Sequence, residues 1–267
     1  MLPHVLILLP PSEGKAAPAE GLPVDLDSLS FPELTAERID LLGVLVRLCR
    51  KEPAAAAVAL ALGPRQAEEV ERNAMLPQAP AAPARHVYTG VLYEAMGLRH
   101  LTGPAAVRAD SWLAVTSALW GLLRPSDRIP AYRLGGGVNL PGVGPIASYW
   151  RTPLRKTIPA VVGEDFVVDL RSTTYAAFWK PDAQTMARTA TVRILHEHAG
   201  RRTVVSHHNK ATKSRVVHQL LDHGDEPASA ADLADLLRTL GWTVELSPGG
   251  PRTPATLDVI VSEVAAK

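Results

Sequence analysis

The sequence predicts an α+β fold in which helices surround a mixed sheet. Short apolar, β-branched runs typical of strands recur in the second half of the chain. Helical patterns lie among them without the strict alternation of βαβ units. The chain of 267 residues is long enough to bury a large core as one large domain or two small ones, and a helical subregion is expected at about 35–75.

The first half is expected to hold one strand followed by helices. Residues 4–9 are a short apolar run that two prolines stop, which is typical of a buried strand. Thr35 is expected to cap the first helix, since Glu37 lies early in that helix and basic residues lie late, which suits the helix dipole. The expected helices and the Pro/Ala linker behind them cover 36–51, 54–62, 64–72 and 79–84.

The second half is expected to supply most of the sheet. Residues 166–170 are the clearest central strand, because they are apolar on both faces and end in charge. Residues 86–89 are interpreted as a strand or the start of a helix, and 115–120 as a buried apolar segment. Further strands are expected at 187–195, 202–207, 242–246 and 257–261, and further helices at 213–221 and 231–240.

Composition excludes several classes of protein. Hydrophobic residues make up 46% of the chain and the formal net charge is +1, so the chain is not globally disordered. The apolar run near the N-terminus is too short to cross a membrane and lacks the flanks of a secretory signal. Cys49 is the only cysteine, which excludes an internal disulfide and fits a reducing cytoplasm. We interpret Cys49 as a core residue and expect a cytoplasmic protein without membrane contact.

The balanced total charge hides a basic middle. Residues 124–215 hold fifteen Lys and Arg against six Asp and Glu. This surplus predicts a polyanionic partner such as DNA, a nucleotide or another phosphate, although a solvated face with scattered ion pairs is the alternative. The candidate nucleic-acid-binding residues are Arg124, Arg128, Arg133, Gly142, Gly144, Arg151, Lys210, Lys213 and Arg215.

A polar loop directly follows the first predicted strand. Ser12 and Lys15 are of the types that hold a phosphate, and Glu13 is a candidate base or an ion-pair partner of Lys15. Loops at the carboxyl ends of buried strands are where α/β sheets bind ligands. The loop is not a P-loop, because the first glycine is missing and Ala16 follows the lysine. The alternative is a turn with surface charges.

The segment 138–147 contains a Pro-Gly-x-Gly turn similar to the hairpin of helix-hairpin-helix DNA-binding proteins. In such hairpins glycine N–H groups at a helix N-terminus bind backbone phosphate, a role for which Gly142 and Gly144 are the candidates. The alternative is a Gly/Pro loop, because three glycines precede the segment and make a preceding helix doubtful.

Two further polar clusters follow predicted strands. Asp169 and Arg171 lie two residues apart at a strand end and either orient a ligand or form a structural ion pair. His207 and Asn209 lie between a strand and a helix, and no histidine spacing fits a known metal site, so we expect no metal and no cofactor. The full candidate pocket comprises Ser12, Glu13, Lys15, Tyr88, Thr89, Tyr93, Ser117, Trp120, Asp169, Arg171, Ser172, Tyr175, His207 and Asn209.

Taken together, these stretches resemble the YaaA family of peroxide-stress proteins. The matching segments are LLPPSEGK (8–15), RHVYTGVLYEAM (85–96), SALWGLLRPSDRIPAYRL (117–134), LPGVGPIASYWR (140–151), VVDLRSTTYAAFW (167–179) and VVSHHNKATKSRVV (204–217). The PPSEGK loop is that of the actinobacterial branch, whereas the enterobacterial branch has SPAKT in its place.

The resemblance implies a cytosolic protein that limits free iron and oxidative DNA damage under peroxide. It also implies a single mixed α/β fold, one domain over 1–267, with a basic cleft and a helix-hairpin-helix element that binds DNA. That element is either 140–147 or the region 41–72. The resemblance assigns no catalytic residue.

Three hypotheses follow. The first is a stress protein that binds duplex or distorted DNA through its basic residues. The second is an enzyme that acts on a small nucleobase- or phosphate-containing ligand in the polar pocket, through Ser12/Glu13/Lys15, Asp169/Arg171 and His207/Asn209/Lys210. The third is direct iron sequestration by histidines and carboxylates. The sequence does not indicate an oligomeric state.

Overall fold

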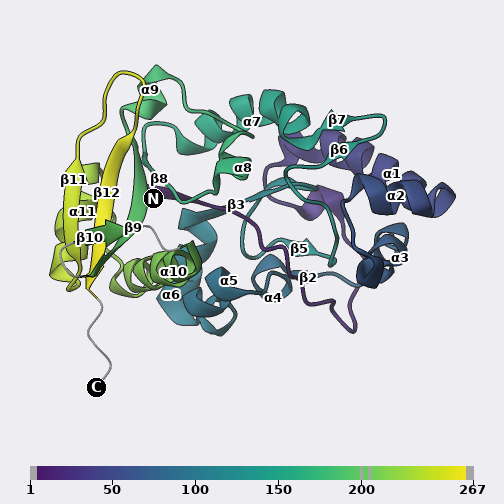
Figure 1. The fold of residues 1–267 in the computed structure, drawn as a ribbon, viewed down its shortest axis with the longest axis horizontal. Helices are drawn as coiled ribbons and strands as arrows, with labels where there is room; N and C mark the ends of the chain where they lie inside the picture. The colour runs from purple at the N-terminus through teal and green to yellow at the C-terminus, as the bar shows by residue number, and fades with distance from the viewer. Residues whose placement is uncertain (1–4, 199–200, 204–205, 263–267) are drawn as a thin grey trace.

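The computed structural model describes residues 5–198, 201–203 and 206–262, without the side chains of 206–208 and 262. Its centre is an eight-stranded mixed sheet of order β11-β12-β9-β8-β1-β3-β4, in which β10 also pairs with β9 (Figure 1). Helices surround this mixed sheet, which confirms that part of the predicted architecture, although the parallel inner strands give an α/β character that the α+β prediction lacks. The strands are β1 Val5–Leu9, β3 Leu113–Ser117, β4 Gly121–Leu123, β8 Phe166–Asp169, β9 Thr189–His198, β10 Arg201–Thr203, β11 Thr243–Ser247 and β12 Ala255–Ser262.

The five inner strands run parallel. β1 pairs in parallel with β3 on one side and with β8 on the other, and β8, β9 and β12 continue the parallel series. β4 and β11 close the two edges in antiparallel orientation. All five residues of β1 are buried, as its uninterrupted apolar sequence predicts for a strand covered on both faces.

The helices near β1 come from distant parts of the chain. α10 (Ser206–His223) contacts α5 (Val91–Met96) and α6 (Gly103–Trp112), and α6 packs on β1 and β3. In Figure 1 these three helices lie below β1 and β8, and α7 (Ile146–Val162) lies above them. α11 (Ala230–Thr239) packs on β11 and β12.

Short elements connect these helices and strands. β2 (Ala82–Pro83) pairs with β5 (Arg128–Ile129), and β6 (Asn139–Leu140) pairs with β7 (Gly144–Pro145). The remaining short helices are η1 Leu26–Ser28, η2 Pro32–Leu34, α4 Ala84–Val87, η4 Leu98–His100, α8 Thr173–Ala176 and α9 Ala183–Met186. In the described part of the chain, no helix has the length and apolar character needed to cross a membrane.

The helical subregion comprises α1 (Thr35–Lys51), α2 (Pro53–Ala59), η3 (Pro64–Gln66) and α3 (Glu68–Ala74). Thr35 does not cap α1: Leu34 occupies the cap position, and no side-chain cap bond is made there. The fully buried Arg38 attaches α1 to the sheet instead, donating to the carbonyl oxygens of Trp120 at 3.0 Å and Leu122 at 2.8 Å. Cys49 is buried on α1, and burial raises the pKa of its thiol.

The segment 138–147 is a two-stranded hairpin that a loop precedes, because β6 pairs with β7 and residues 134–138 are not helical. α7 follows directly, although the sequence pattern predicted no helix there. It holds Pro153 and Pro159, which remove two backbone donors. The helix is stabilised by burial of Trp150, Leu154 and Ile158, which lie one turn apart on one face.

The expected strand over 202–207 is wrong at 206–207, which belong to α10, and residues 204 and 205 lie outside the described part of the chain. β10 ends at Thr203, and α10 begins at Ser206 rather than near Lys213. Thr212 and Ser214 are buried together with the apolar face of α10, so the packed part of this helix begins before Val216. Tertiary packing therefore extends the helix beyond the apolar pattern visible in the sequence.

Candidate functional site

Two loops meet at the carboxyl edge of the central strands. The loop Pro10–Lys15 follows β1, and the segment Leu170–Tyr175 follows the neighbouring parallel strand β8. The chain leaves β1 for β3 on one side and later returns to β8 on the other side. This change of direction is a topological switch point, where open α/β sheets leave a crevice for a ligand.

The loop after β1 is held in place by backbone contacts. The Tyr93 hydroxyl donates to the Pro10 carbonyl at 2.9 Å, and the Thr89 N–H donates to the Gly14 carbonyl at 3.2 Å. A side chain at Gly14 would begin 2.9 Å from the Thr89 hydroxyl, so this close approach requires glycine. Tyr93 and Thr89 therefore serve the loop as supports.

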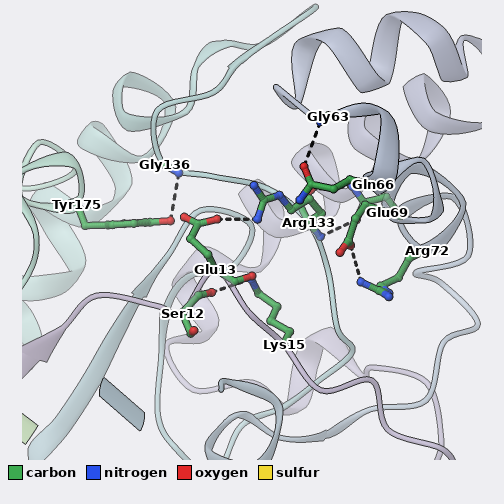
Figure 2. A network of polar contacts seen from close by, with 11 residues as sticks. Ser12, Glu13, Lys15, Gly63, Gln66, Glu69, Arg72, Arg133, Gly136 and Tyr175 are labelled. Carbon is green, nitrogen blue, oxygen red and sulfur yellow. Dashed lines mark hydrogen bonds and ion pairs between the residues drawn. The ribbon is translucent and has the colours of Figure 1, made fainter. Parts of the chain in front are cut away.

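Lys15 braces the loop from below. Its ammonium donates to the Ser12 carbonyl at 2.9 Å and lies 4.2 Å from the centre of the Tyr132 ring. Burial lowers the pKa of Lys15 to about 8, although the Glu13 carboxylate acts in the opposite direction. Figure 2 shows Lys15 extending away from the side on which Glu13 lies.

Buried hydroxyl groups lie beneath Lys15. Tyr132 shares hydrogen bonds with Tyr88 at 3.0 Å and with Ser117 at 2.7 Å, and the Ser117 hydroxyl accepts from the Trp120 N–H at 3.1 Å. Burial raises the pKa of Tyr88 to about 12. Tyr88, Ser117 and Trp120 thus belong to the core under the loop and not to a ligand-facing wall.

Glu13 faces the opposite side of the loop. Its carboxylate pairs with Arg133 at 3.0 Å and remains more than half exposed (Figure 2). The Tyr175 hydroxyl accepts a hydrogen bond from the Gly136 N–H at 3.1 Å. A side chain on Gly136 would begin 3.0 Å from the Tyr175 ring, so this glycine lets the loop 135–137 approach that ring.

Asp169 and Arg171 form a structural ion pair. Nε and Nη2 of Arg171 donate to the two Asp169 oxygens at 2.9 and 2.7 Å. The same guanidinium donates to the carbonyl oxygens of Tyr175 at 3.3 Å and Trp179 at 3.0 Å, and its side chain is 1% exposed. Arg171 therefore folds the segment 172–179 back onto the end of β8, and its guanidinium is engaged by these contacts within the fold.

Four distant parts of the chain line one cavity of about 400 Å³, one of them Gly90–Leu92 at the N-terminus of α5. Ser12 and Glu13 come from the loop after β1, Ser172 and Tyr175 from the segment after β8, and Lys210 from α10. A neighbouring cavity of about 600 Å³ shares Glu13, Ser172 and Tyr175 and adds these residues: Val58, Ala59, Leu60, Ala61, Arg133, Gly135, Gly136, Gly137, Val138, Asn139 and Thr174. The two cavities together are called the strand-end cleft below.

The sequence pattern did not indicate the second cavity. Val58–Ala61 come from the end of α2, and Gly135–Asn139 come from the loop before the β6–β7 hairpin. The run Gly135–Gly137 was the only available signal, since three glycines allow a backbone to approach a ligand or a ring closely. The contribution of α2 has no signal in the sequence.

α10 brings its basic residues to the cleft unequally. Lys210 is exposed and lines the smaller cavity, whereas Lys213 is half-buried. Burial lowers the pKa of Lys213, and the nearby Asp169 carboxylate opposes this effect. Asn209 is half-buried, and the side chain of His207 lies outside the described residues.

The remaining candidate DNA-binding residues are spread over the molecule. Arg124 donates to the carbonyl oxygens of Ser111 and Leu113, both at 2.8 Å, and burial lowers its pKa. Arg128 donates to the Ala81 carbonyl at 2.7 Å. Arg151 and Arg215 are exposed on α7 and α10, and Gly142 and Gly144 lie in the β6–β7 hairpin. Within the described part of the chain, no three His, Cys, Asp or Glu side chains gather as a metal site.

The sheet and its cleft define an α/β protein with a polar, ligand-sized cavity at the carboxyl edge of parallel strands. The family model described as peroxide stress protein YaaA matches residues 5–246. The chain therefore belongs to the YaaA family, as its sequence motifs predict.

Relatives of nearly equal length support this assignment. UPF0246 protein SCO2297 of Streptomyces coelicolor is 49% identical over 261 residues, which cover 97% of this chain and 100% of that protein. UPF0246 protein CE1889 of Corynebacterium efficiens is 38% identical over 253 residues, which cover 93% of this chain and 98% of that protein.

Replacing Arg171 by Gln is expected to destabilise the fold by about 3–5 kcal/mol, because it leaves a partly buried Asp169 carboxylate and two carbonyl oxygens without their donor. Arg202→Gln is the matched control, since its ion pairs with Glu197 and Glu245 are exposed and are expected to contribute far less to stability. Urea unfolding followed by circular dichroism measures both. Equal losses of unfolding free energy in the two variants would contradict the structural role of Arg171.

Lys15 is expected to make stability depend on pH. The pKa of Lys15 is near 8 in the folded state and about 10.4 in the unfolded state. Between these two pH values the unfolded state therefore binds more protons than the folded state. The free energy of unfolding of the wild type, relative to Lys15→Met, should therefore rise as the pH increases from about 8 to about 10. Urea unfolding across this range measures it, with Lys51→Met as the exposed control. A flat difference would show that Lys15 is not desolvated.

Proposed function

We propose that this peroxide-stress family member binds a small nucleobase- or phosphate-containing ligand in the strand-end cleft. The observation that carries the proposal is the convergence of Ser12 and Glu13, Ser172 and Tyr175, and Lys210 on one cavity of about 400 Å³. Such convergence of polar groups from separate segments is the usual property of a pocket that recognises one molecule.

The chemistry of the lining groups supports this class of ligand. The Glu13 carboxylate accepts hydrogen bonds, as from the N–H groups of a base, and Lys210 supplies an exposed ammonium that suits a phosphate. The hydroxyl groups of Ser12 and Ser172 both donate and accept. Arg133 holds the Glu13 carboxylate at the wall that the two cavities share.

The cleft proposal predicts ligand-dependent stability. A nucleoside, nucleotide or inorganic phosphate present at about one hundred times its Kd should raise the free energy of unfolding by about 2.7 kcal/mol. A thermal-shift screen of these three classes, followed by calorimetric titration, measures it. Glu13→Gln and Lys210→Gln should each weaken binding of the best ligand by at least about tenfold, because each removes one charged contact, worth roughly 1.5–3 kcal/mol.

Glu164→Gln and Lys51→Gln are the matched controls, since both residues are exposed and neither lines the cleft. These two variants should bind like the wild type. If no member of the three ligand classes stabilises the protein, the cleft proposal is wrong.

We propose DNA binding as a second function, through which the protein limits iron-dependent oxidative damage. Its support is the helical subregion: residues 60–63 connect α2 with η3 and α3, and Leu60 and Ala61 line the larger cavity. Of the two candidate helix-hairpin-helix segments, the region 41–72 has helices on both sides of its connection, whereas a loop precedes 140–147. Lys210 and Arg215 are exposed on α10, with Lys210 at the other end of the same cleft.

DNA binding predicts a steep dependence on salt. The logarithm of the binding constant should fall linearly with the logarithm of the salt concentration, by about 0.9 for each phosphate contacted. Lys210→Ala together with Arg215→Ala should reduce this slope by about 2, whereas Arg201→Ala together with Arg252→Ala, also exposed, should leave it unchanged. Fluorescence anisotropy with duplex, bubbled and single-stranded DNA measures the slope. Binding that stays constant from low to moderate salt would rule DNA out.

A further inference from the structure

A third cavity, apart from the two that form the strand-end cleft, lies between α7 and the segment that follows α8. Its volume is about 350 Å³, and it shares no lining residue with the strand-end cleft. Both α7 and this segment come from the basic middle of the chain. The lining residues are Arg151, Arg155, Pro159, Trp179, Lys180, Pro181 and Asp182.

The cations of this cavity are not used by the fold. Arg151, Arg155 and Lys180 are exposed, and their side chains form no ion pair or hydrogen bond with another described residue. Elsewhere on the surface, arginines pair with acids: Arg85 lies 3.1 Å from Asp110, and Arg202 lies 2.8 Å from Glu245.

Arg151 and Arg155 also lie one turn apart on α7, where like charges repel. An anion between them would remove this repulsion. The arrangement therefore favours a negatively charged ligand over an empty surface.

The one acid in the cavity is already engaged. The Asp182 carboxylate caps α9 by accepting the Thr185 N–H at 2.8 Å, and its hydrogen bonds to Thr185 lower its pKa. It is therefore ionised at neutral pH, and its bonding capacity is partly used by the helix cap. Three cations against one acid leave the lining with a positive surplus.

The other walls of the cavity are apolar. Pro159, Pro181 and Trp179 line these walls, and Trp179, which is only 1% exposed, is held against the Arg171 guanidinium, which lies 5.2 Å from its ring centre. A volume of about 350 Å³ is in the range of pockets for small organic molecules. A bare inorganic ion would leave these walls without contacts.

We propose that this cavity binds a phosphate ester, with the phosphate held by Arg151, Arg155 and Lys180 and the organic part held by the two prolines. Planar guanidinium groups bind phosphate oxygens through paired hydrogen bonds, which an ammonium group can supplement as a point charge. This site is independent of the strand-end cleft, so the failure of one proposal does not affect the other.

Calorimetric titration with inorganic phosphate and with phenyl phosphate at low ionic strength tests the site. Phenyl phosphate should bind in a saturable manner and more tightly than inorganic phosphate, because only the ester contacts the apolar walls. Arg151→Gln together with Arg155→Gln should weaken phenyl phosphate binding by at least about tenfold. Both residues are exposed, so circular dichroism should show an unchanged fold.

The matched control is Arg201→Gln together with Arg252→Gln, which removes the same charge from exposed positions outside the cavity. This control should change phenyl phosphate binding by less than about twofold. Equal weakening in both double variants, or no saturable binding of phenyl phosphate to the wild type, would overturn the proposal.

A competition experiment distinguishes the sources of the phosphate. If a short DNA duplex displaces phenyl phosphate from the wild type, the site takes a backbone phosphate of nucleic acid. If the duplex does not compete, the site takes a free phosphate ester. Both outcomes support a phosphate site on α7, and only the partner differs.

Discussion

The parallel pairing of β1 with both of its neighbours is the constraint on which the rest of the molecule depends. Five buried apolar residues lie between β3 and β8, so this strand can shift neither in register nor in direction without exposing its side chains or breaking two ladders. The ends of β1 and β8 are thereby fixed at the same edge. The polar residues Ser12, Glu13, Ser172 and Tyr175 of the strand-end cleft follow those two ends directly.

Buried Arg and Lys side chains attach further segments of the chain to the sheet and its loops. Arg38 connects the helical subregion to the carbonyl groups around β4, Arg171 folds the segment after β8, and Lys15 holds the loop after β1. Each one donates to backbone carbonyl oxygens: Arg38 to those of Trp120 and Leu122, Arg171 to those of Tyr175 and Trp179, and Lys15 to that of Ser12. A buried carbonyl without a donor is costly, so these side chains fix irregular backbone as firmly as secondary structure does elsewhere.

The positive surplus of the middle segment therefore divides into two groups with different roles. Arg124 and Arg171 point inward and serve the fold. Arg151, Arg155 and Lys210 remain at the surface and line cavities. The chain belongs to a family of peroxide-stress proteins. Its ligand sites are best looked for where exposed cations and other polar groups line the same cavity.

The sequence by itself determined the mixed sheet, most of its strands and the family. Periodicity and the end of an apolar run depend on local residues, which is why the loop after β1 and the strand before Asp169 were predictable. Only the tertiary structure decided that Arg171 is a brace, that α7 forms despite two prolines, and that Val58–Ala61 border the cleft. These outcomes depend on which distant segments meet across the sheet, and contacts of that kind leave no periodic signal in a single sequence.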